Sequence, residues 1–488
     1  MRILFITPPP YLPNRLHRNR SFDLIRILAK KHEVHLLSIV AQKETPKEFD
    51  QIIKVCKSVK VIYINPLVAI FNCLRFPFLP YEIAYCYSKK TKQEIQKIIK
   101  SHKIDLVYLK RLRSAIYLLQ SKTLLEKCHS ELVEESFSTE LVDRDPSTQP
   151  VPSVVEGVGM TTKVVVDTTD AMSMFYFRMY KSHSFPKNLF YLLQAVLYKR
   201  FEKKTIEKIR NWIVCSESDQ KYLQKLGADV NIYVVSNPVD TGYFSPRRSS
   251  FFTPKESRSL PRHLRGVASF SPSRWPKDSS KVERRDEQGS SLLFRGLMDK
   301  PVNIDACLFF IKEIMPLVKK KIENVKLYIV GPKPPSVIKK CNDGKSIFVT
   351  GFVKDIRKCI KDTDLSICPV RIASGTRFKI TQAWAMGRPV VSTSNGAEGL
   401  LYEKDKNIAI ADNPKEFAKQ IVSLLKNKKL YDTLAKNGRE TIVREYSFRV
   451  IGQRLERVIQ NFTLHKRHSG NQASPEHPES PNVIRDAG

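Results

Sequence analysis

Residues 372–400 read IASGTRFKITQAWAMGRPVVSTSNGAEGL, and this stretch decides the fold class. The small residues at 374–376 form a turn that can expose backbone N–H groups at the start of a helix, where the helix dipole favours an anion. Gly387 can end that helix, and the following run Val390–Thr393 has the composition of a buried parallel strand. A helix that leads into a buried strand in this way is typical of an open α/β sheet.

Charged side chains in the same stretch indicate a ligand. Arg377 and Lys379 place two cations beside the turn, and an arginine fork suits two phosphate oxygens. The loop Asn395–Gly399 lies at the carboxyl end of the strand, where open α/β sheets bind ligands, and it carries Glu398. Cations for a phosphate and a carboxylate for hydroxyl groups together predict a nucleotide-sugar pocket. The alternative is an ordinary helix–strand unit that binds no ligand. This alternative is disfavoured because so many features of a ligand site follow one another in the expected order.

The stretch resembles the donor-binding signature of glycosyltransferase group 4, a family of retaining enzymes with the GT-B fold. The resemblance covers about residues 1–127, 163–248 and 291–463 and is strongest over 290–400. It implies two Rossmann-like doubly wound domains that face each other across a cleft, with a C-terminal helix that crosses back onto the first domain. It also implies an enzyme that needs no metal ion, and no cofactor besides a nucleotide-diphosphate sugar as donor substrate.

The resemblance assigns roles to individual residues. Arg377 and Lys379 are expected to be catalytic, because cations stabilise the charge that develops on a leaving diphosphate. Glycine at 296 lets the backbone approach a ligand. The expected donor-binding residues are Gly296, Ser374, Gly375, Thr376, Gln382, Gly396, Glu398 and Gly399.

The first domain is expected to hold the acceptor, which the resemblance implies is a saccharide or a lipid-linked saccharide of the cell envelope. Arg20 matches a recurrent arginine of the family. Asp167 and Asp170 follow an apolar strand and would position an acceptor hydroxyl group, or else cap the next helix. We therefore expect Arg20, Asp167 and Asp170 to bind the acceptor.

Two departures from the family pattern keep other functions open. Many members carry two glutamates with seven residues between them, and Ser374 and Gln382 stand in those places. Glutamine still accepts a hydrogen bond from a ribose hydroxyl group, but without charge. The loop after the first strand, residues 8–20, also has no glycine. The alternatives are a degenerate relative that binds nucleotide or nucleic acid without catalysis, and a nucleotide-sugar epimerase of the same fold.

Apolar strands and amphipathic helices alternate along the chain, as in a parallel sheet covered by helices. The pattern predicts two domains, over 1–240 and 241–445, then a last helix over 446–464 and a disordered tail over 465–488. The resemblance implies that the first domain holds the acceptor, that the second holds the donor and that the last helix crosses over. Two polar stretches, 128–162 and 249–290, lack periodic apolar faces and are predicted to be disordered insertions. An RNA- or partner-binding arm is the other interpretation of these stretches.

Composition limits the partners. The chain has 83 Lys and Arg against 49 Asp and Glu, a net charge of +34, which suggests an anionic partner. No zinc-finger spacing or RNA-recognition pattern is present, so we expect no specific nucleic acid, and peripheral contact with an anionic membrane is the favoured use of the charge. Nine scattered cysteines without a Cys-x-x-Cys pair indicate a reducing compartment. The protein is expected to be cytoplasmic, with peripheral contact on the cytoplasmic face of the membrane.

Residues 66–80, PLVAIFNCLRFPFLP, are the most apolar candidate for a surface. Arg75, Pro77 and Pro80 interrupt the run well below the length that spans a bilayer. Because its apolar residues show no clean helical face, a core piece or loop is preferred over an interfacial membrane patch. The apolar run at residues 1–10 is too short for a signal peptide.

Overall fold

The structure is a computed structural model of residues 1–488, of which 1–9, 20–41, 52–119, 162–227, 230–246, 290–372 and 375–464 are described below. Nearly all of the two predicted insertions, the whole predicted tail and Ser374 lie outside the described residues. The predictions made for them therefore stay predictions.

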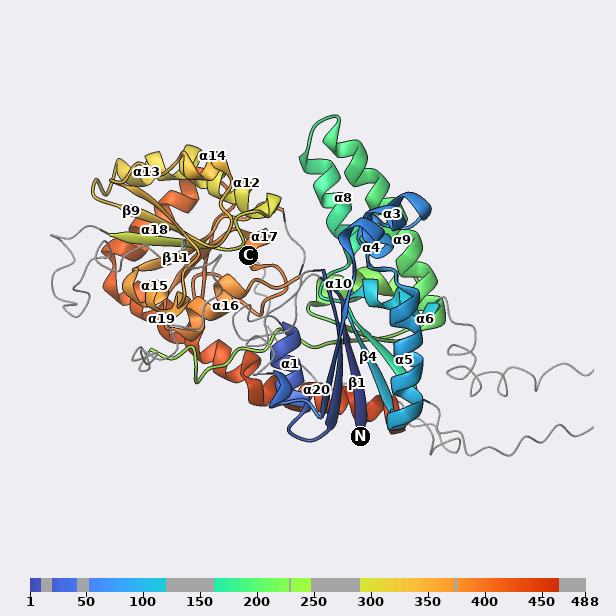
Figure 1. The fold of residues 1–488 in the computed structure, drawn as a ribbon. Helices are drawn as coiled ribbons and strands as arrows, with labels where there is room; N and C mark the ends of the chain where they lie inside the picture. Colours follow the sequence, from blue (N-terminus) through green and yellow to red (C-terminus); the bar gives the residue numbers. More distant parts are fainter. Residues whose placement is uncertain are drawn as a thin grey trace, which may run out of the picture.

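The first domain is built on a parallel sheet of seven strands in the order β3-β2-β1-β4-β5-β6-β7 (Figure 1). Apolar runs form its centre: all five residues of β4 are buried, as are five of the six in β1. Such strands are covered by helices on both faces. The strands are β1 (Arg2–Thr7), β2 (Glu33–Val40), β3 (Ser58–Tyr63), β4 (Leu106–Lys110), β5 (Lys163–Asp167), β6 (Asn211–Val214) and β7 (Asn231–Val234).

The second domain repeats the plan with six parallel strands in the order β10-β9-β8-β11-β12-β13. Its strands are β8 (Ser291–Arg295), β9 (Lys326–Val330), β10 (Ile347–Gly351), β11 (Leu365–Cys368), β12 (Val390–Ser392) and β13 (Ala409–Ile410). In both sheets the strand order reverses, between β1 and β4 and between β8 and β11. Loops at the carboxyl ends of strands diverge at such a reversal and leave room for a ligand.

Helices connect the strands. Those of the first domain are α1 (Arg20–Leu28), α3 (Pro66–Arg75), α4 (Tyr81–Cys86), α5 (Lys89–His102), α6 (Ile116–Leu119), α8 (Met172–Ser182), α9 (Lys187–Lys208) and α10 (Glu217–Gln224). Those of the second domain are α12 (Pro301–Phe309), α13 (Met315–Lys319), α14 (Ser336–Lys339), α15 (Ile356–Asp362), α16 (Phe378–Ala385), α17 (Ser394–Ala397), α18 (Pro414–Lys426) and α19 (Lys428–Thr441). A π-helical turn, Phe310–Ile314, joins α12 to α13.

The last helix, α20 (Phe448–Leu464), leaves the second domain and runs beneath the first (Figure 1). Its apolar face carries Ile451, Leu455 and Ile459, which are fully buried in one cluster with Ile3 and Phe5 of β1. Burial of this kind stabilises by roughly 1.5–3 kcal/mol per aliphatic side chain. The C-terminal segment is therefore part of the core of the first domain.

The architecture confirms the predicted α/β fold with two Rossmann-like domains and a helix that crosses back. One preference was wrong for most of its length: residues 66–75 form helix α3, with only Ala69 and Asn72 of its ten residues buried, while residues 76–80 form the loop before α4. Asn65 caps α3 through its side chain and Pro66 occupies its first turn, which explains why it starts there. Over the described residues, no helix is long and apolar enough to cross a membrane.

Candidate functional site

The helix predicted to receive an anion starts without a side-chain cap among the described residues. Arg377 is the N-cap of α16, and no side chain caps this end of the helix. Ser216, Asp355 and Asn413 cap α10, α15 and α18 through their side chains, while α8, α9 and α12, like α16, have no side-chain cap. The first N–H groups of a helix need an acceptor from outside it. At α16 that acceptor is expected to be a ligand anion.

Three cations gather around this helix start without an ion pair among the described residues. The Nε and Nη2 atoms of Arg377 are buried and have no hydrogen-bond partner there, and Arg295 at the end of β8 has a buried Nε in the same condition. Lys379 donates from Nζ to Oδ1 of Asn303 at 2.8 Å and lies 4.3 Å from the centre of the Phe294 ring. A buried donor nitrogen of a cation without a hydrogen-bond partner is costly. An anion bound at this position would remove that cost.

The electrostatics of Lys379 fit an anion site. Burial lowers the pKa of Lys379 to about 8, and the neighbouring cations Arg377 and Arg295 contribute to the shift. Burial also lowers the pKa of Arg295 to about 10. Lys379 is therefore held in a positive environment, and Arg295 in a desolvated one. A diphosphate would raise both pKa values by favouring the charged forms.

Gln382 lies on α16 beside Arg295. Its Oε1 accepts from Nη1 of Arg295 at 2.5 Å, while Nη2 of the same arginine donates to the carbonyl oxygen of Phe378 at 2.8 Å. Gln382, which stands in place of the family's glutamate, thus accepts a hydrogen bond from Arg295, a residue that sequence analysis did not single out. The signal for Arg295 was its place at the end of β8, next to the reversal in strand order.

Glycines bring the backbones of the site close together. Gly375 has φ +69°, and a methyl group added to it would lie 1.9 Å from Oδ1 of Asp170 in the first domain. Gly399 has φ +77°, and a methyl group there would lie 2.7 Å from Cβ of Ser216, also in the first domain. Gly296 packs against the Asn303 side chain. The positive φ angles and the short approaches explain why glycine occupies positions 375 and 399.

Glu398 joins the two domains. Its carboxylate accepts from Nη1 and Nη2 of Arg178 on α8 at 2.5 and 2.8 Å, and from Oγ of Ser218 on α10 at 2.8 Å. Burial raises the pKa of Glu398, but hydrogen bonds from Arg178 and Ser218 outweigh it and the pKa lies below its usual value. The predicted turn at 395–399 is partly helical, since α17 spans Ser394–Ala397, and Gly396 in it packs against Ser392.

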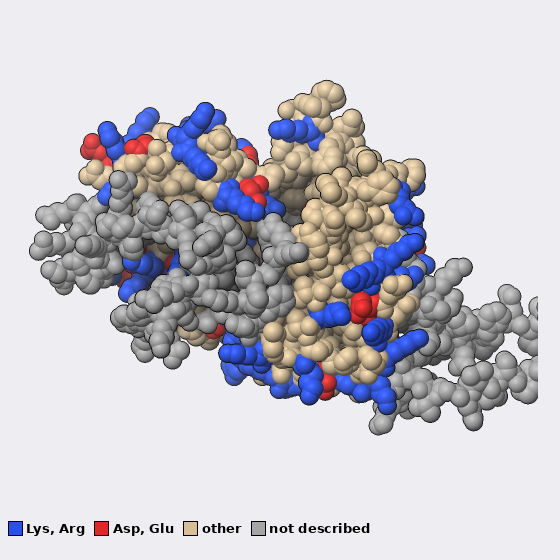
Figure 2. Space-filling model, in the orientation of Figure 1, with Lys and Arg blue, Asp and Glu red and all other residues tan. Residues whose placement is uncertain are grey.

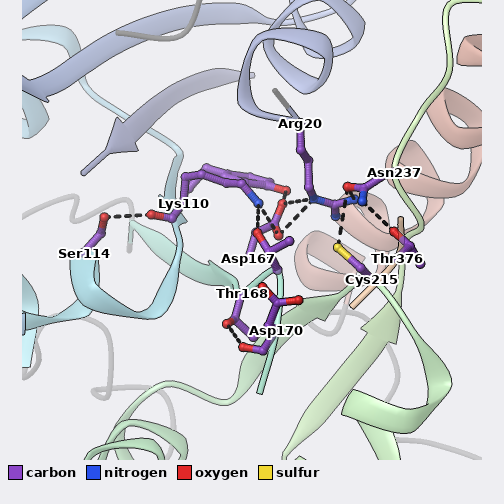
Figure 3. A network of polar contacts seen from close by, with 11 residues as sticks. Arg20, Lys110, Ser114, Asp167, Thr168, Asp170, Cys215, Asn237 and Thr376 are labelled. Carbon is purple, nitrogen blue, oxygen red and sulfur yellow. Dashed lines mark hydrogen bonds and ion pairs between the residues drawn. The ribbon is translucent and has the colours of Figure 1, made fainter. Parts of the chain in front are cut away.

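A buried polar network lies beneath the domain interface (Figure 3). Asp167 is fully buried and accepts from Nζ of Lys110 at 2.9 Å, from Nε of Arg20 at 3.1 Å and from the Tyr108 hydroxyl group at 2.5 Å. Burial raises the pKa of Asp167, but the charges of Arg20 and Lys110 outweigh it and lower that pKa. The Asp167 carboxylate is therefore ionised, and its oxygens are already occupied by hydrogen bonds from these three side chains.

The network reaches the second domain through Asn237. Its Oδ1 accepts from Nη1 of Arg20 at 3.3 Å, and its Nδ2 donates to Oγ1 of Thr376 at 2.5 Å (Figure 3). Thr376 is the residue next to Gly375 in the turn before α16. The predicted donor turn is thus held in place by a residue of the first domain.

Asp170 has a different environment from Asp167. Asp170 lies in the first domain and faces the second, against Gly375, and its carboxylate accepts no hydrogen bond from a described side chain. Burial and the nearby Asp219 carboxylate raise the pKa of Asp170 to about 6, although Arg377 and Arg111 act in the opposite direction. A carboxyl group with a pKa near neutrality at a domain interface is suited to exchange a proton.

The structure brings together most of the predicted site residues. Arg377, Lys379, Gln382, Gly375, Thr376 and Glu398 surround the start of α16 or the facing α17 turn, and Asp170 faces them from the first domain. Arg20 and Asp167 lie below this surface, so in this conformation they support Asn237 and Thr376 and do not present groups to an acceptor. Sequence analysis missed Arg295, Asn237, Arg178 and Ser218, whose parts depend on contacts between distant segments.

Within the described ranges, no three His, Cys, Asp or Glu side chains come together in a way that could hold a metal ion. The eight cysteines in those ranges are free thiols, which agrees with their scattered positions in the sequence. Metal independence of the reaction stays a prediction.

Comparison with known proteins supports the sequence resemblance. Residues 289–427 match the family model described as glycosyl transferases group 1, which covers the second domain from β8 to α18 and includes α16. A Klebsiella pneumoniae protein, described as an uncharacterized 44.6 kDa protein in the cps region, is 26% identical over 183 residues. That alignment covers 36% of this chain and 45% of the relative, so the chain matches less than half of the relative's length.

Solved structures share the whole architecture. Alr3699/HepE of Anabaena in complex with UDP matches with a TM-score of 0.56 at 14% identity, over 94% of this chain and 100% of that one. Sucrose-phosphate synthase of Thermosynechococcus elongatus matches with a TM-score of 0.60 at 13% identity, over 95% of this chain and 100% of that one. At these identities the likeness establishes the fold, which is GT-B.

Proposed function

We propose that this chain, whose second domain matches the glycosyl transferases group 1, is a retaining glycosyltransferase. It takes a sugar from a nucleotide-diphosphate sugar and, without a metal ion, transfers it to a saccharide or lipid-linked acceptor in cell-envelope polysaccharide synthesis. The observation that carries the proposal is that two buried nitrogens of Arg377, Nε and Nη2, lack a hydrogen-bond partner among the described residues, beside Lys379 at the start of α16. The Anabaena protein binds UDP and UDP-glucose on the same fold, which supports a nucleotide-sugar donor here.

In the proposed reaction the diphosphate of the donor lies at the start of α16. The N–H groups of the first turn and the side chains of Arg377 and Lys379 bind its oxygens. As the bond between the sugar and the diphosphate breaks, negative charge grows on the leaving oxygen. Preorganised cations stabilise that charge more than the charge of the bound donor, and this difference accelerates the reaction.

The acceptor approaches from the first domain, where Asp170 faces Gly375. Its raised pKa allows Asp170 to hold the acceptor hydroxyl group and to take its proton at neutral pH. The leaving diphosphate is the other group that can take this proton. The Klebsiella relative from a cps region supports a polysaccharide as the product.

Ligand-induced thermal stabilisation tests the donor site. The protein is titrated with UDP-, GDP- and ADP-sugars, together with the variant Arg377→Ala/Lys379→Ala. We expect the melting temperature to rise with one nucleotide class and this rise to disappear in the variant. The control is Lys358→Ala/Lys415→Ala, which removes two exposed cations from α15 and α18 and should keep the response.

The chemistry needs a separate readout. Slow hydrolysis of the preferred donor, followed by NMR, reports the anomer that is released first, and retention predicts the anomer of the donor. Stabilisation by nucleotide without hydrolysis or transfer would favour the degenerate binding protein. Equal stabilisation of wild type and the Arg377→Ala/Lys379→Ala variant would contradict the proposed donor site.

A further inference from the structure

Helix α3 exposes an apolar face. Leu67, Ile70, Phe71 and Leu74 are spaced i, i+3, i+4, i+7, so they lie on one side of the helix. They are 75%, 56%, 61% and 76% exposed. Phe78, in the turn that follows, is 82% exposed. The apolar residues thus form the helical face that the sequence interpretation did not see, and this face points away from the core.

Helices α8 and α9 form a hairpin with a second apolar face. Leu189, Leu193 and Val196 on α9 follow the same helical spacing and are 60%, 53% and 49% exposed, while Phe185 before α9 is 79% exposed. The opposite side of α9, with Tyr198 and Phe201, packs into the domain. We call the exposed apolar side chains of 66–78 and 177–196 the apolar shoulder.

The two parts of the apolar shoulder are joined through α4. The backbone N–H of Tyr81 donates to Oε1 of Gln194 on α9 at 3.1 Å, and the rings of Tyr81 and Phe190 have centroids 5.8 Å apart. Figure 1 shows the hairpin rising above the first domain with α3 beside it. In Figure 2 this part of the molecule carries few charged side chains, whereas Lys and Arg are frequent on the surface below it. Soluble monomers rarely expose so many large apolar side chains together.

The charges within these segments all have one sign. Residues 171–201 contain no Asp or Glu and five cations: Arg178, Lys181, Lys187, Lys199 and Arg200. Residues 65–81 contain Arg75 and no acidic residue. Exposed leucine and phenylalanine with interspersed cations, and no carboxylate, complement an anionic lipid surface. A second copy of the chain would fit this surface less well, because it would set the cations of both copies against each other.

The apolar shoulder is connected to the proposed site. Helix α8 begins two residues after Asp170, and its eleven residues span about 16 Å. Arg178, in the middle of this helix, binds Glu398 of the second domain. A membrane-anchored substrate whose lipid lies at the shoulder would therefore have its head group within about one short helix of Asp170.

We propose that the apolar shoulder inserts into the headgroup region of an anionic membrane and that the acceptor is delivered there as a lipid-linked saccharide. This inference rests on the proposed function for the identity of the acceptor. The binding of lipid itself does not, because it needs neither donor nor acceptor.

Vesicle flotation with the full chain tests the proposal. Vesicles of phosphatidylcholine with and without phosphatidylglycerol are compared for three proteins: wild type, Phe71→Ser/Leu74→Ser/Leu189→Ser, and the matched control Val337→Ser/Leu401→Ser/Val443→Ser. The control residues are 46%, 51% and 45% exposed and lie in the second domain. We expect wild type and control to float with anionic vesicles, and the shoulder variant to bind at least tenfold more weakly. Lys181→Glu/Lys187→Glu should also weaken binding, only where phosphatidylglycerol is present.

Three results would overturn the proposal: flotation of the shoulder variant equal to wild type, equal flotation with and without anionic lipid, or a wild-type dimer that the shoulder variant converts to a monomer. The last would assign the surface to a second copy of the chain. Nucleotide-induced thermal stabilisation is measured on the same proteins, and it should be unchanged in the shoulder variant. Loss of flotation with an intact nucleotide response separates failure at the membrane from failure of the donor site.

Discussion

Arg377 combines three properties that an internal structural role does not explain. Its Nε and Nη2 atoms are buried and lack a partner among the described residues, it sits at the N-cap of α16, and it lies near Arg295 and Lys379. Each property is unfavourable in the free protein. The buried donors lose hydration, the like charges of the three cations repel one another, and a cation at the start of a helix opposes the helix dipole. A bound anion would offset all three costs, so we interpret the cluster as a binding site.

Lys379 makes the donor affinity depend on pH. Burial and the neighbouring Arg377 and Arg295 lower its pKa to about 8, so the free protein loses this charge as the pH rises through that value, while the phosphates are already ionised. The dissociation constant of the preferred nucleotide diphosphate should therefore increase above about pH 8, by up to roughly tenfold for one charge-assisted contact. In the unfolded chain Lys379 keeps its ordinary pKa of 10.5, so it binds its proton more tightly there than in the folded protein. Burying the charged lysine therefore lowers the free energy of unfolding below pH 8, and this loss disappears as the pH rises from 8 to above 10.5.

The control for this pH effect is Lys379→Arg, since an arginine side chain does not lose its proton in proteins. Calorimetric titration with nucleotide between about pH 7 and pH 9.5 should give a flat profile for the variant. Identical profiles for wild type and variant would show that another group titrates.

Gln382 offers a test of what the missing glutamate does. Arg295 donates to its Oε1 and has a buried Nε without a partner. In Gln382→Glu a carboxylate would accept from this arginine with a charge-assisted bond, which stabilises by about 1 kcal/mol more than the neutral one. We expect the melting temperature to rise by about 2–4 °C. Gln382→Leu, which leaves Arg295 with one acceptor fewer, should lower it. A lower melting temperature in both variants would mean that the packing around Gln382, and not its hydrogen bond with Arg295, determines its contribution to stability.

Residue types alone predicted the two cations and the glycines of the site, because phosphate binding and close backbone approach require such residues. They did not predict that Asp167 is buried beneath Arg20 and Lys110, because an aspartate at the end of a strand has the same local sequence whether it faces solvent or a buried cation. Burial is a property of the assembled domain.

At the scale of elements, α16 and the turn before it depend on Gly375. The alternation of apolar runs predicted nearly every strand and most of the helices, because helices and buried strands have different periods. It missed α3 because the exposed apolar residues of this helix look like core in the sequence. It also took Asn395–Gly399 as a loop, although Thr393 caps the short helix α17.

Gly375→Ala tests the turn against a matched glycine. Gly344 has nearly the same backbone, φ +67° against +69°, but a methyl group there would meet nothing within 4 Å. Both substitutions should cost about 1 kcal/mol of unfolding free energy because of the left-handed backbone. Only Gly375→Ala should also abolish nucleotide-induced stabilisation, since its methyl group would displace Asp170 or the turn. Retained nucleotide binding in Gly375→Ala would show that the donor does not depend on this turn.

At the scale of the whole molecule, the described contacts between the two domains include three that bear on how the domains are held together. Helix α20 buries its apolar face in the first domain, Asn237 links Arg20 to Thr376, and Glu398 binds Arg178 and Ser218. The first contact is large and apolar and should persist in all states. The other two are polar and involve the turns on either side of the proposed donor, so they are the contacts that a change in domain angle would make or break.

Arg178→Ala is therefore expected to favour an open arrangement of the domains. The pair with Glu398 is bidentate, and its side chains are 31% and 20% exposed, so its loss should cost about 1 kcal/mol of closure and shift the ratio of closed to open molecules about fivefold. Small-angle X-ray scattering should show a larger radius of gyration for the free variant than for the free wild type, and the preferred nucleotide sugar should reduce this difference because it binds turns from both sides. The control is Arg371→Ala, which removes an ion pair of equal N–O distance, 2.5 Å, between Arg371 and Asp305 inside the second domain. If both variants change the radius of gyration equally, or neither does, the Arg178–Glu398 pair does not set the domain angle, and control of closure passes to Asn237 and Thr376.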